Sequence, residues 1–116
     1  MNQVVQSPAS RKLDTVIAAI SDPTRRAIVE RLARGPASIS DVAAPFPMSL
    51  TGFIKHVRVL ERAGLVRRTR SGRENTLELS AEPLRDVATW VFSYASFWNA
   101  RLDQFERHFA QQKERR

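Results

Sequence analysis

The stretch SISDVAAPFPMSLTGFIKHVRVLERAG, residues 38–64, decides the fold of this 116-residue chain. Ser38 precedes a short helix expected over residues 39–44, because a serine side chain accepts a hydrogen bond from a free amide of the first helical turn. A Pro-Phe-Pro segment, residues 45–47, stops that helix, since proline lacks the amide proton that a helix interior needs. A second helix is expected over residues 50–63. Two helices joined by a tight connection predict a helix-turn-helix.

The second of these helices carries two chemically different faces. An apolar stripe at helical spacing is expected to face the core and consists of Leu50, Phe53, Val57 and Leu60. A polar row lies on the opposite side and consists of Thr51, Lys55, Arg58 and Arg62. The helix therefore presents a positively charged side to solvent, and Gly64 ends it.

The segments on either side complete a fold that is mainly α with a small β-hairpin. Residues 13–21 and residues 23–34 have helical periodicity, and the Asp-Pro pair before the second of them favours a helix start. Alternating residues 65–69 and 75–79 flank a glycine and predict a hairpin, which forms a wing when it follows a helix-turn-helix. One long final helix, about 40 Å in length, is expected from Pro83 onward.

Composition narrows the functional classes. The chain carries 19 Lys and Arg against 12 Asp and Glu, a net charge of +7, which favours a polyanionic partner. Cysteine is absent, which excludes disulfides, thiolate metal ligands and cysteine nucleophiles. We expect one domain over residues 11–112, between a flexible tail of residues 1–10 and a charged end of residues 113–116. No apolar run is long enough to cross a bilayer, so we expect a cytoplasmic protein that does not enter membranes.

Most of the net charge lies in one segment. Seven basic residues stand against one acidic residue between Lys55 and Arg73. The segment contains both the outward face of the helix at residues 50–63 and the hairpin tip, two places that can contact a DNA backbone while a helix enters the major groove. The alternative is a solvated basic face with scattered salt bridges. The clustering at these two places favours DNA.

Three ordered blocks resemble the ArsR family of winged-helix repressors. Residues 53–66, FIKHVRVLERAGLV, resemble its recognition helix and the exit from that helix into the wing. Residues 22–29, DPTRRAIV, are similar to its opening helix motif, and residues 70–73, RSGR, are similar to its wing. The resemblance covers residues 13–80. It implies a homodimeric transcriptional repressor that binds an imperfect palindromic operator in double-stranded DNA.

The expected DNA-contacting residues fall into two groups. Candidates for contacts with base edges are Ser49, Thr51, Gly52, Lys55 and His56. Candidates for phosphate contacts are Arg58, Arg62, Arg67, Arg68 and Arg70, with Arg73 at the wing tip on phosphate or in the minor groove. For His56, helix packing or a phosphate contact is an equal alternative. Ile54 stands where the resembled family often has a small polar residue, and it either packs inward or contacts a thymine methyl group.

Metal sensing, which is common in the resembled family, is not expected here. Its metal-sensing members carry paired cysteines on the first helix of the motif, where this chain has Ser38 and Ser40, and hydroxyls bind soft metals poorly. Asp103, Glu106 and His108 form at most a weak hard-ligand set, which a charged solvent face explains better. We therefore expect no metal and no other cofactor.

The terminal helices are expected to form a dimer interface. Seven of the nine aromatic residues lie between Trp90 and Phe109, more than one helix can bury against a small domain. A second copy of the chain would cover them through Leu13, Val16, Ile17 and Ile20 of the first helix and Val91, Tyr94, Trp98, Leu102 and Phe105 of the last. A pocket for an unidentified small-molecule effector between the paired helices is the alternative to a plain aromatic interface.

The function expected from these patterns is sequence-specific DNA binding by a transcriptional regulator. An enzyme is disfavoured, because the chain has no Gly-rich phosphate loop and its two histidines give no plausible Ser/His/Asp set. The alternative is a protein-interaction or RNA-binding winged-helix module that uses the aromatic final helix.

Overall fold

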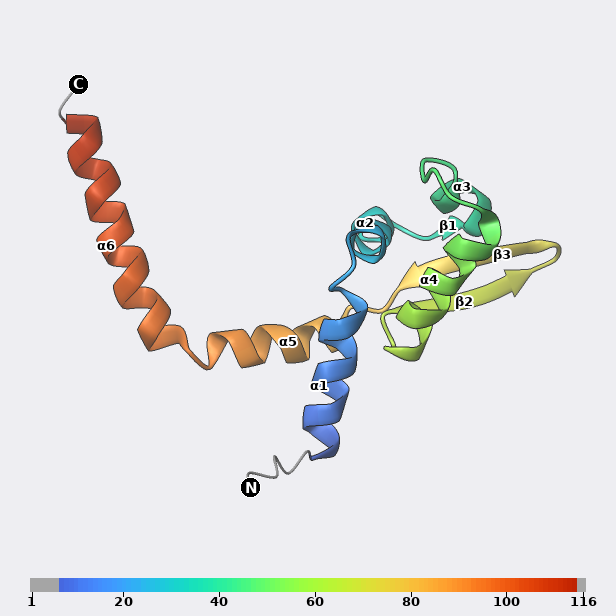
Figure 1. Ribbon diagram of the computed structural model, residues 1–116, viewed down its shortest axis with the longest axis horizontal. Helices are drawn as coiled ribbons and strands as arrows, with labels where there is room; N and C mark the ends of the chain where they lie inside the picture. Colours follow the sequence, from blue (N-terminus) through green and yellow to red (C-terminus); the bar gives the residue numbers. More distant parts are fainter. Residues whose placement is uncertain (1–6, 115–116) are drawn as a thin grey trace.

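The computed structural model describes the backbone of residues 7–114 and the side chains of residues 7–97 and 99–112. In chain order the elements are α1 (Pro8–Ala19), α2 (Pro23–Leu32), β1 (Ala37–Ser38), α3 (Ile39–Ala43), α4 (Leu50–Arg62), β2 (Val66–Ser71), β3 (Glu74–Leu79), α5 (Glu82–Phe92) and α6 (Ala95–Glu114). The expected mainly α fold with a β-hairpin is confirmed (Figure 1). α3 and α4 form the helix-turn-helix, and β2 and β3 form the wing.

Three helices begin at side-chain caps formed by residue types that commonly start helices. Asp22 Oδ2 accepts a hydrogen bond from the amide of Arg25 at 3.0 Å, at the start of α2. Ser38 and Ser49 each accept, through Oγ, from the amide three residues later at 3.1 Å, which starts α3 and α4. Each cap satisfies an amide that has no partner inside its own helix. Local chemistry therefore fixes where the helices of the motif begin.

The first helix begins earlier than the expected residue 13. Ser7 Oγ accepts from the amide of Ser10 at 3.1 Å, and Pro8 occupies the first helical position, where no amide proton is needed. Residues 8–10 therefore belong to α1 rather than to a flexible tail. The remainder of the expected tail, residues 1–6, lies outside the described part of the chain.

The wing is part of a three-stranded antiparallel sheet in the order β1-β3-β2. β2 and β3 pair from Val66 opposite Leu79 to Ser71 opposite Glu74, which leaves a two-residue turn. Gly72 begins this turn with a φ of 63°, a backbone conformation that such tight hairpins require. The strand β1 was not predicted, because two residues give no alternation pattern. Its pairing with β3 joins the helix-turn-helix to the wing.

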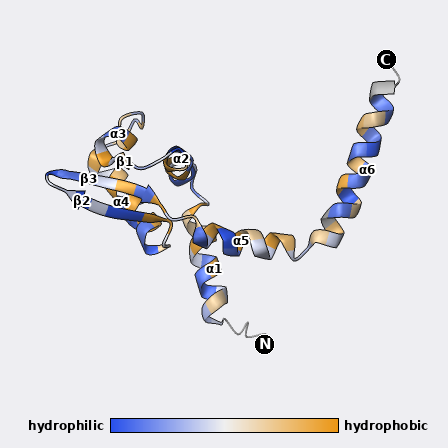
Figure 2. Cartoon of the chain, turned by 180° about the vertical axis from the view of Figure 1, so that it is seen from behind, coloured by the Kyte–Doolittle hydropathy of each residue, from blue (hydrophilic) through white to orange (hydrophobic). Residues whose placement is uncertain are grey.

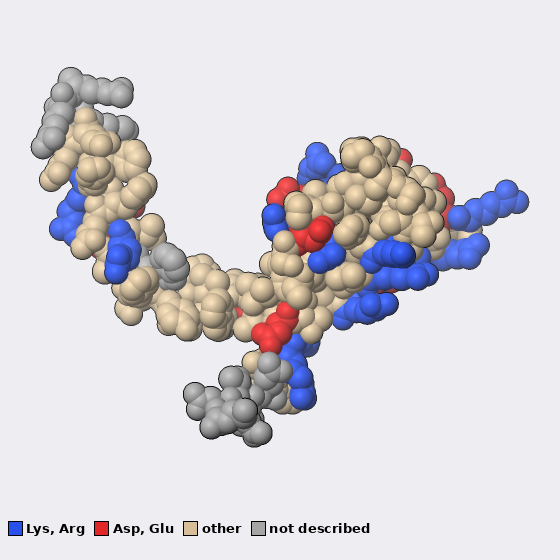
Figure 3. Space-filling view, viewed as in Figure 1, with Lys and Arg blue, Asp and Glu red and all other residues tan. Residues whose placement is uncertain are grey.

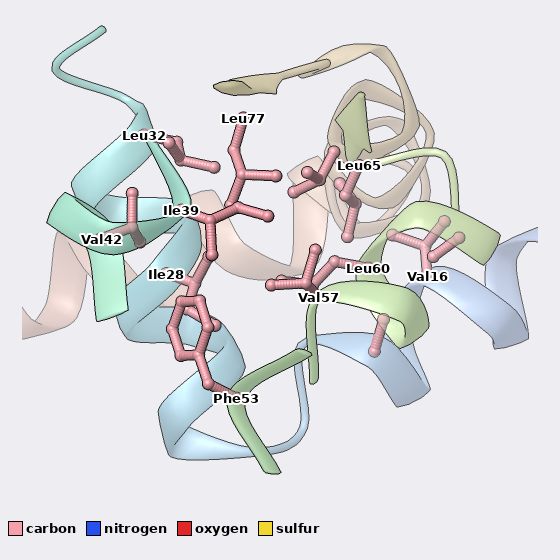
Figure 4. Close-up of a cluster of buried hydrophobic side chains, with 13 residues drawn as sticks. Val16, Ile28, Leu32, Ile39, Val42, Phe53, Val57, Leu60, Leu65 and Leu77 are labelled. Atoms are coloured by element: carbon pink, nitrogen blue, oxygen red, sulfur yellow. The ribbon is translucent and has the colours of Figure 1, made fainter. Parts of the chain in front are cut away.

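The hydrophobic core lies between the helices and the sheet, with α4 at its centre (Figure 4). Phe53, Val57 and Leu60 of α4 are at most 1% exposed. The residues packed with them are Val16 of α1, Ile28 and Leu32 of α2, Ile39 and Val42 of α3, Leu65, and Val66 and Leu77 of the wing strands. Leu50 was expected in the same stripe, and that prediction is wrong, because its side chain is 57% exposed. The first turn of α4 extends past the edge of the core.

The predicted single final helix is wrong, because the chain forms two helices there. α5 ends at Phe92, and the Ser93 hydroxyl donates to the carbonyl of Trp90 at 2.6 Å. The Tyr94 amide donates to the carbonyl of Val91, three residues back, instead of the one four residues back. Serine bonds of this kind compete with the regular helical pattern. α6 leaves the break in a different direction and continues to Glu114, into the expected charged end (Figure 1).

Residues 90–114, called here the C-terminal arm, extend away from the compact part of the molecule. The radius of gyration is 19.1 Å, against about 13 Å for a compact domain of this length. Hydrophobic residues continue along α5 and recur along α6 (Figure 2). The large apolar side chains described in the arm are exposed. The arm therefore carries apolar surface that this chain does not itself cover.

The burial difference along α4 predicts two contrasting substitutions. Phe53→Ala removes a buried ring and should lower the free energy of unfolding by about 3 to 5 kcal/mol, whereas Leu50→Ala should change it by about 0.5 kcal/mol or less. Urea denaturation followed by circular dichroism measures both. Equal losses for the two variants would show that Leu50 packs in the core.

Candidate nucleic-acid interface

The outward row of α4 is accessible along its whole length. Thr51, Lys55, Arg58 and Arg62 are all exposed, while the opposite face of the helix is buried. The core therefore fixes the rotation of α4 about its axis. With α4 in this rotation, the polar row points to solvent, as its helical spacing predicts.

The start of α4 is shaped by Ser49 and Gly52. The Ser49 hydroxyl accepts from the Gly52 amide, so its oxygen already serves the helix cap. A Cβ added at position 52 would lie 3.3 Å from Ser49 Oγ, tighter than most such contacts. Gly52 thus leaves room for the cap and exposes backbone at the front of the helix.

A tight turn holds the wing at a fixed position relative to α4. The Gly64 amide donates to the carbonyl of Glu61 at 3.0 Å, and the Leu65 amide donates to the carbonyl of Leu60 at 2.9 Å. This bonding pattern, with a left-handed glycine of φ 77°, is a Schellman motif. Leu65 is itself fully buried and leads directly into β2. The outward row of α4 and the wing are therefore parts of one rigid unit.

The arginines of the wing do not all have the same surroundings. Arg67 and Arg70 are exposed on opposite faces of the hairpin, as the alternation of β2 requires, and Arg73 is exposed in the turn. Arg67 Nη2 lies 3.6 Å from Glu78 Oε2, a loose surface pair. Basic side chains gather over the lower edge of the compact part and at the wing tip (Figure 3).

Arg68 was expected to contact phosphate, but in the structure its side chain is engaged within the protein. Its Nη2 donates to Glu61 Oε1 at 2.7 Å, and both side chains are half-buried between α4 and β2. Arg68 points to the core side of the hairpin because its partner across the strands is the buried Leu77. Arg68 therefore connects the wing to α4, and the carboxylate of Glu61 neutralises its charge.

His56 lies on another side of α4 from the outward row. Its Nδ1 is 3.2 Å from Arg25 Nη1 and 3.9 Å from Asp22 Oδ2, so the ring packs against the start of α2. A guanidinium can only donate, so Nδ1 is the acceptor in this contact. Of the two expectations for His56, the structure places it in helix packing.

Sequence reasoning assigned no role to Arg25, although its contacts connect three helices. Its Nε donates to the carbonyl of Ala19 at 2.6 Å and its Nη2 to the carbonyl of Ala18 at 3.2 Å, at the end of α1. Arg26 Nη1 donates to the next carbonyl, that of Ile20, at 2.9 Å. These bonds engage carbonyls at the C-terminal end of α1, where partners inside the helix run out, although the Ala18 carbonyl also accepts from the amide and the hydroxyl of Ser21. The only hint of this role in the sequence is the pair of adjacent arginines that follows the Asp-Pro helix start. The carbonyls that accept their hydrogen bonds can be identified only from the fold.

The expected dimer-interface residues separate into a buried and an exposed group. Val16 is 1% exposed in the core of its own chain, so its expected interface role is wrong, and Leu13 and Ile20 are half-buried. The exposed members are Ile17, Val91, Tyr94, Leu102 and Phe105. The side chain of Trp98 lies outside the described residues. The exposed group forms a discontinuous apolar surface on α1 and the C-terminal arm.

Other kinds of site have little support in the described residues. An open depression between α1 and α5, lined in part by Leu13, Asp86 and Trp90, is a surface feature and not an enclosed cavity. Among residues that the structure describes, no cluster of three potential metal ligands occurs. No described helix is both long and apolar enough to span a bilayer.

Comparison with known proteins gives a consistent result. A family model described as a helix-turn-helix domain matches residues 20–69, which span α2 to the middle of the wing. The chain is 35% identical over 92 residues to the HTH-type transcriptional regulator Rv2034 of Mycobacterium tuberculosis, covering 79% of this chain and 83% of the relative. It is 30% identical over 82 residues to the transcriptional repressor SdpR of Bacillus subtilis, covering 71% and 91% respectively.

Solved structures agree with these relatives. The crystal structure of an ArsR family transcriptional regulator matches with 40% identity and a TM-score of 0.71, covering 76% of this chain and 97% of that chain. An ArsR-like transcriptional regulator from Rhodococcus sp. RHA1 matches with 30% identity and a TM-score of 0.68, covering 87% and 95%. The matched part includes the helix-turn-helix and the wing described above.

The cap at Asp22 predicts a specific dependence of stability on pH. The Arg25 amide, which donates to Oδ2, lowers the pKa of the Asp22 carboxyl below its ordinary value of 3.8, an effect that desolvation partly offsets and that the nearby charges of His56 and Arg25 reinforce. The ionised carboxylate therefore stabilises the fold above pH 3.8, and this contribution is lost as the pH falls through the lowered pKa.

Two variants test this expectation. Asp22→Ala should lower the free energy of unfolding by about 1 kcal/mol at pH 7, because the cap is removed. Asp22→Asn keeps a capping oxygen without a charge, so the stability of the wild type relative to this variant should fall as the solution is acidified below pH 4 or so. Urea titrations between pH 7 and pH 2 measure the difference. A difference that stays constant over this range contradicts the assignment.

Proposed function

This chain belongs to the ArsR family of winged helix-turn-helix transcriptional regulators and binds DNA as a regulator of transcription; from this premise, we propose that it is a homodimeric repressor of an imperfect palindromic operator. In this proposal α4 enters the major groove, and the wing contacts the backbone or the adjacent minor groove. The protein acts by binding in the cytoplasm and carries out no catalysis. The likeness to a named repressor, SdpR, supports repression as the regulatory direction.

One observation carries the proposal. The exposed basic row of α4 and the exposed arginines of the wing lie on one rigid unit, because the Schellman turn at Gly64 and the Arg68–Glu61 ion pair join them. A helix in the major groove needs flanking contacts to the phosphates on either side of that groove. Arg58 and Arg62 on the helix and Arg70 and Arg73 on the wing supply cations at such positions.

Base recognition is assigned to the front of α4. The first turn of a recognition helix approaches the base edges most closely, and its backbone is accessible here because residue 52 is glycine. Thr51 and Lys55 are the exposed polar side chains nearest that end. Lysine donates to the O6 and N7 atoms of guanine, which gives Lys55 a route to sequence discrimination. His56 and Arg68 are left out of the proposed interface because both are engaged inside the protein.

Exposed surface area supports the homodimer. The accessible surface of the chain is 9,084 Å², against about 6,400 Å² expected for a folded monomer of 13.2 kDa. The excess is about 2,700 Å² per chain, or about 5,300 Å² for two chains, which is the scale of obligate homodimer interfaces that bury about 2,000 to 5,000 Å² or more in total. A second copy that covers the apolar C-terminal arm also supplies a second α4. A palindromic operator needs two such helices, one for each of its half-sites, which lie one helical turn apart.

The salt dependence of DNA affinity tests the proposal directly. Each neutralised phosphate should contribute about −0.9 to the slope of log affinity against log salt concentration. Titration of the purified protein with duplex DNA upstream of its own gene, at four salt concentrations, should give a steep negative slope. Affinity that does not change with salt contradicts the electrostatic interface. Binding to RNA or to a protein through the C-terminal arm, with no duplex binding, would favour the alternative module.

Two substitutions separate base recognition from phosphate contact. Lys55→Ala should reduce the preference for operator over unrelated duplex, by about 1 to 3 kcal/mol if Lys55 contacts guanine. Arg70→Ala should weaken both duplexes by a similar factor and make the salt slope shallower by about 0.9. Fluorescence anisotropy with the two duplexes measures these effects. Equal losses on both sequences for Lys55→Ala would assign that residue to the backbone instead.

A charge placed on the C-terminal arm tests the dimer. Phe105 is 59% exposed in the single chain, so Phe105→Asp should leave the fold intact while it introduces charge into the proposed interface. Sedimentation should then show a monomer, and operator affinity should fall because the two half-sites bind independently. Gln104→Asp, one residue earlier and about 100° around the axis of α6, away from the apolar stripe, is the matched control and should remain a dimer. Identical dimerisation of both variants would contradict this interface.

A further inference from the structure

Leu50 is the most exposed large hydrophobic residue that the structure describes before α5. Its side chain is 57% exposed, compared with 38% for Ile17 and 37% for Met48, the other exposed large apolar residues in that region. A single exposed leucine is common on protein surfaces. Its position is the informative feature, because it occupies the first residue of α4, the helix assigned to the major groove.

Leu50 is exposed because other side chains already fill the end of the core nearest to it. Phe53, one turn later, is buried, and the ring of Phe46 covers it at a centroid distance of 5.5 Å. Phe46, in the turn before α4, is partly buried against the core. This aromatic pair closes the end of the core beneath the first turn of α4. Leu50 is thereby left beyond that end, beside the Ser49 cap.

The surroundings of Leu50 indicate the chemistry of its partner. Leu50 stands at the front of the helix whose outward side carries Thr51, Lys55 and Arg58, so an exposed apolar group adjoins a polar and cationic surface. Among described residues 20–89, Leu50 and Met48 are the exposed large hydrophobics, which is too small an apolar patch for a stable protein interface. A base-pair edge in the major groove matches this mixture, because the thymine C5-methyl is the apolar group on that edge.

We propose that Leu50 is a specificity-determining residue that recognises thymine in each operator half-site through the C5-methyl group. The proposal rests on the proposed function, since it requires α4 to lie in the major groove. Recognition helices present their N-terminal residues to base edges, and Leu50 is the N-terminal residue of α4. Ile54, for which a thymine contact was one of two expectations, is half-buried one turn later and so presents less apolar surface than Leu50.

The test removes the methyl group from the DNA and the side chain from the protein. The wild-type protein first selects a duplex from a random 30-base-pair library, and each thymine of the selected site is then replaced in turn by deoxyuridine, which lacks the C5-methyl. At one position in each half-site, the wild type should lose about fourfold in affinity, the effect of one buried methyl-sized group. The Leu50→Ala variant should bind the thymine and uracil duplexes equally.

Controls distinguish this contact from other effects. Leu50→Met keeps an apolar side chain of similar volume and should retain most of the thymine preference. Leu50→Ala should unfold within about 4 °C of the wild type, and its salt slope on a random duplex should be unchanged, because the basic surface is intact. A wild type that selects no sequence overturns the proposed function itself. A wild type that selects a sequence but shows the same uracil penalty as Leu50→Ala at every position overturns the assignment of Leu50 alone.

Discussion

The burial of Phe53, Val57 and Leu60 is the constraint on which the rest of the structure depends. An isolated helix of 13 residues is marginally stable in water and has no fixed orientation. Packing of these three side chains against α2, α3 and the wing both stabilises α4 and sets its rotation. The cationic row follows from that rotation, because residues on the opposite side of the same helix must face solvent. One face of α4 therefore stabilises the fold, and the opposite face of the same helix forms the proposed DNA-binding surface.

A second set of contacts keeps neighbouring elements in register with α4. The Schellman turn and the Arg68–Glu61 pair hold the wing, while Arg25 connects the end of α1 to His56 on α4. α1 and the C-terminal arm carry the surface assigned to the partner subunit. The Arg25 contacts thus form a direct physical connection between the proposed dimer side of the molecule and α4, the proposed recognition helix. In a two-fold dimer such rigid connections determine the separation of the two recognition helices.

Features set by local chemistry could be predicted from the sequence, and features set by tertiary packing could not. The caps at Asp22, Ser38 and Ser49 depend on residues three positions apart, so their patterns are visible in the chain. Periodicity placed Leu50 in the core, but it carries no information about where the core ends. Arg68 looked like its neighbours in sequence, and only strand alternation against Leu77 turns it towards Glu61. The break at Ser93 was missed because the apolar spacing continues through it.

The direct test of the central claim is a nuclear magnetic resonance titration of the isotope-labelled protein with its operator duplex. The account predicts that the largest amide shift changes fall on the first turn of α4 and on the wing around Gly72. The amides of Phe53, Val57 and Leu60 should change less, and α6 should show no separate DNA contact. Changes concentrated on the C-terminal arm, with α4 and the wing unaffected, would contradict it.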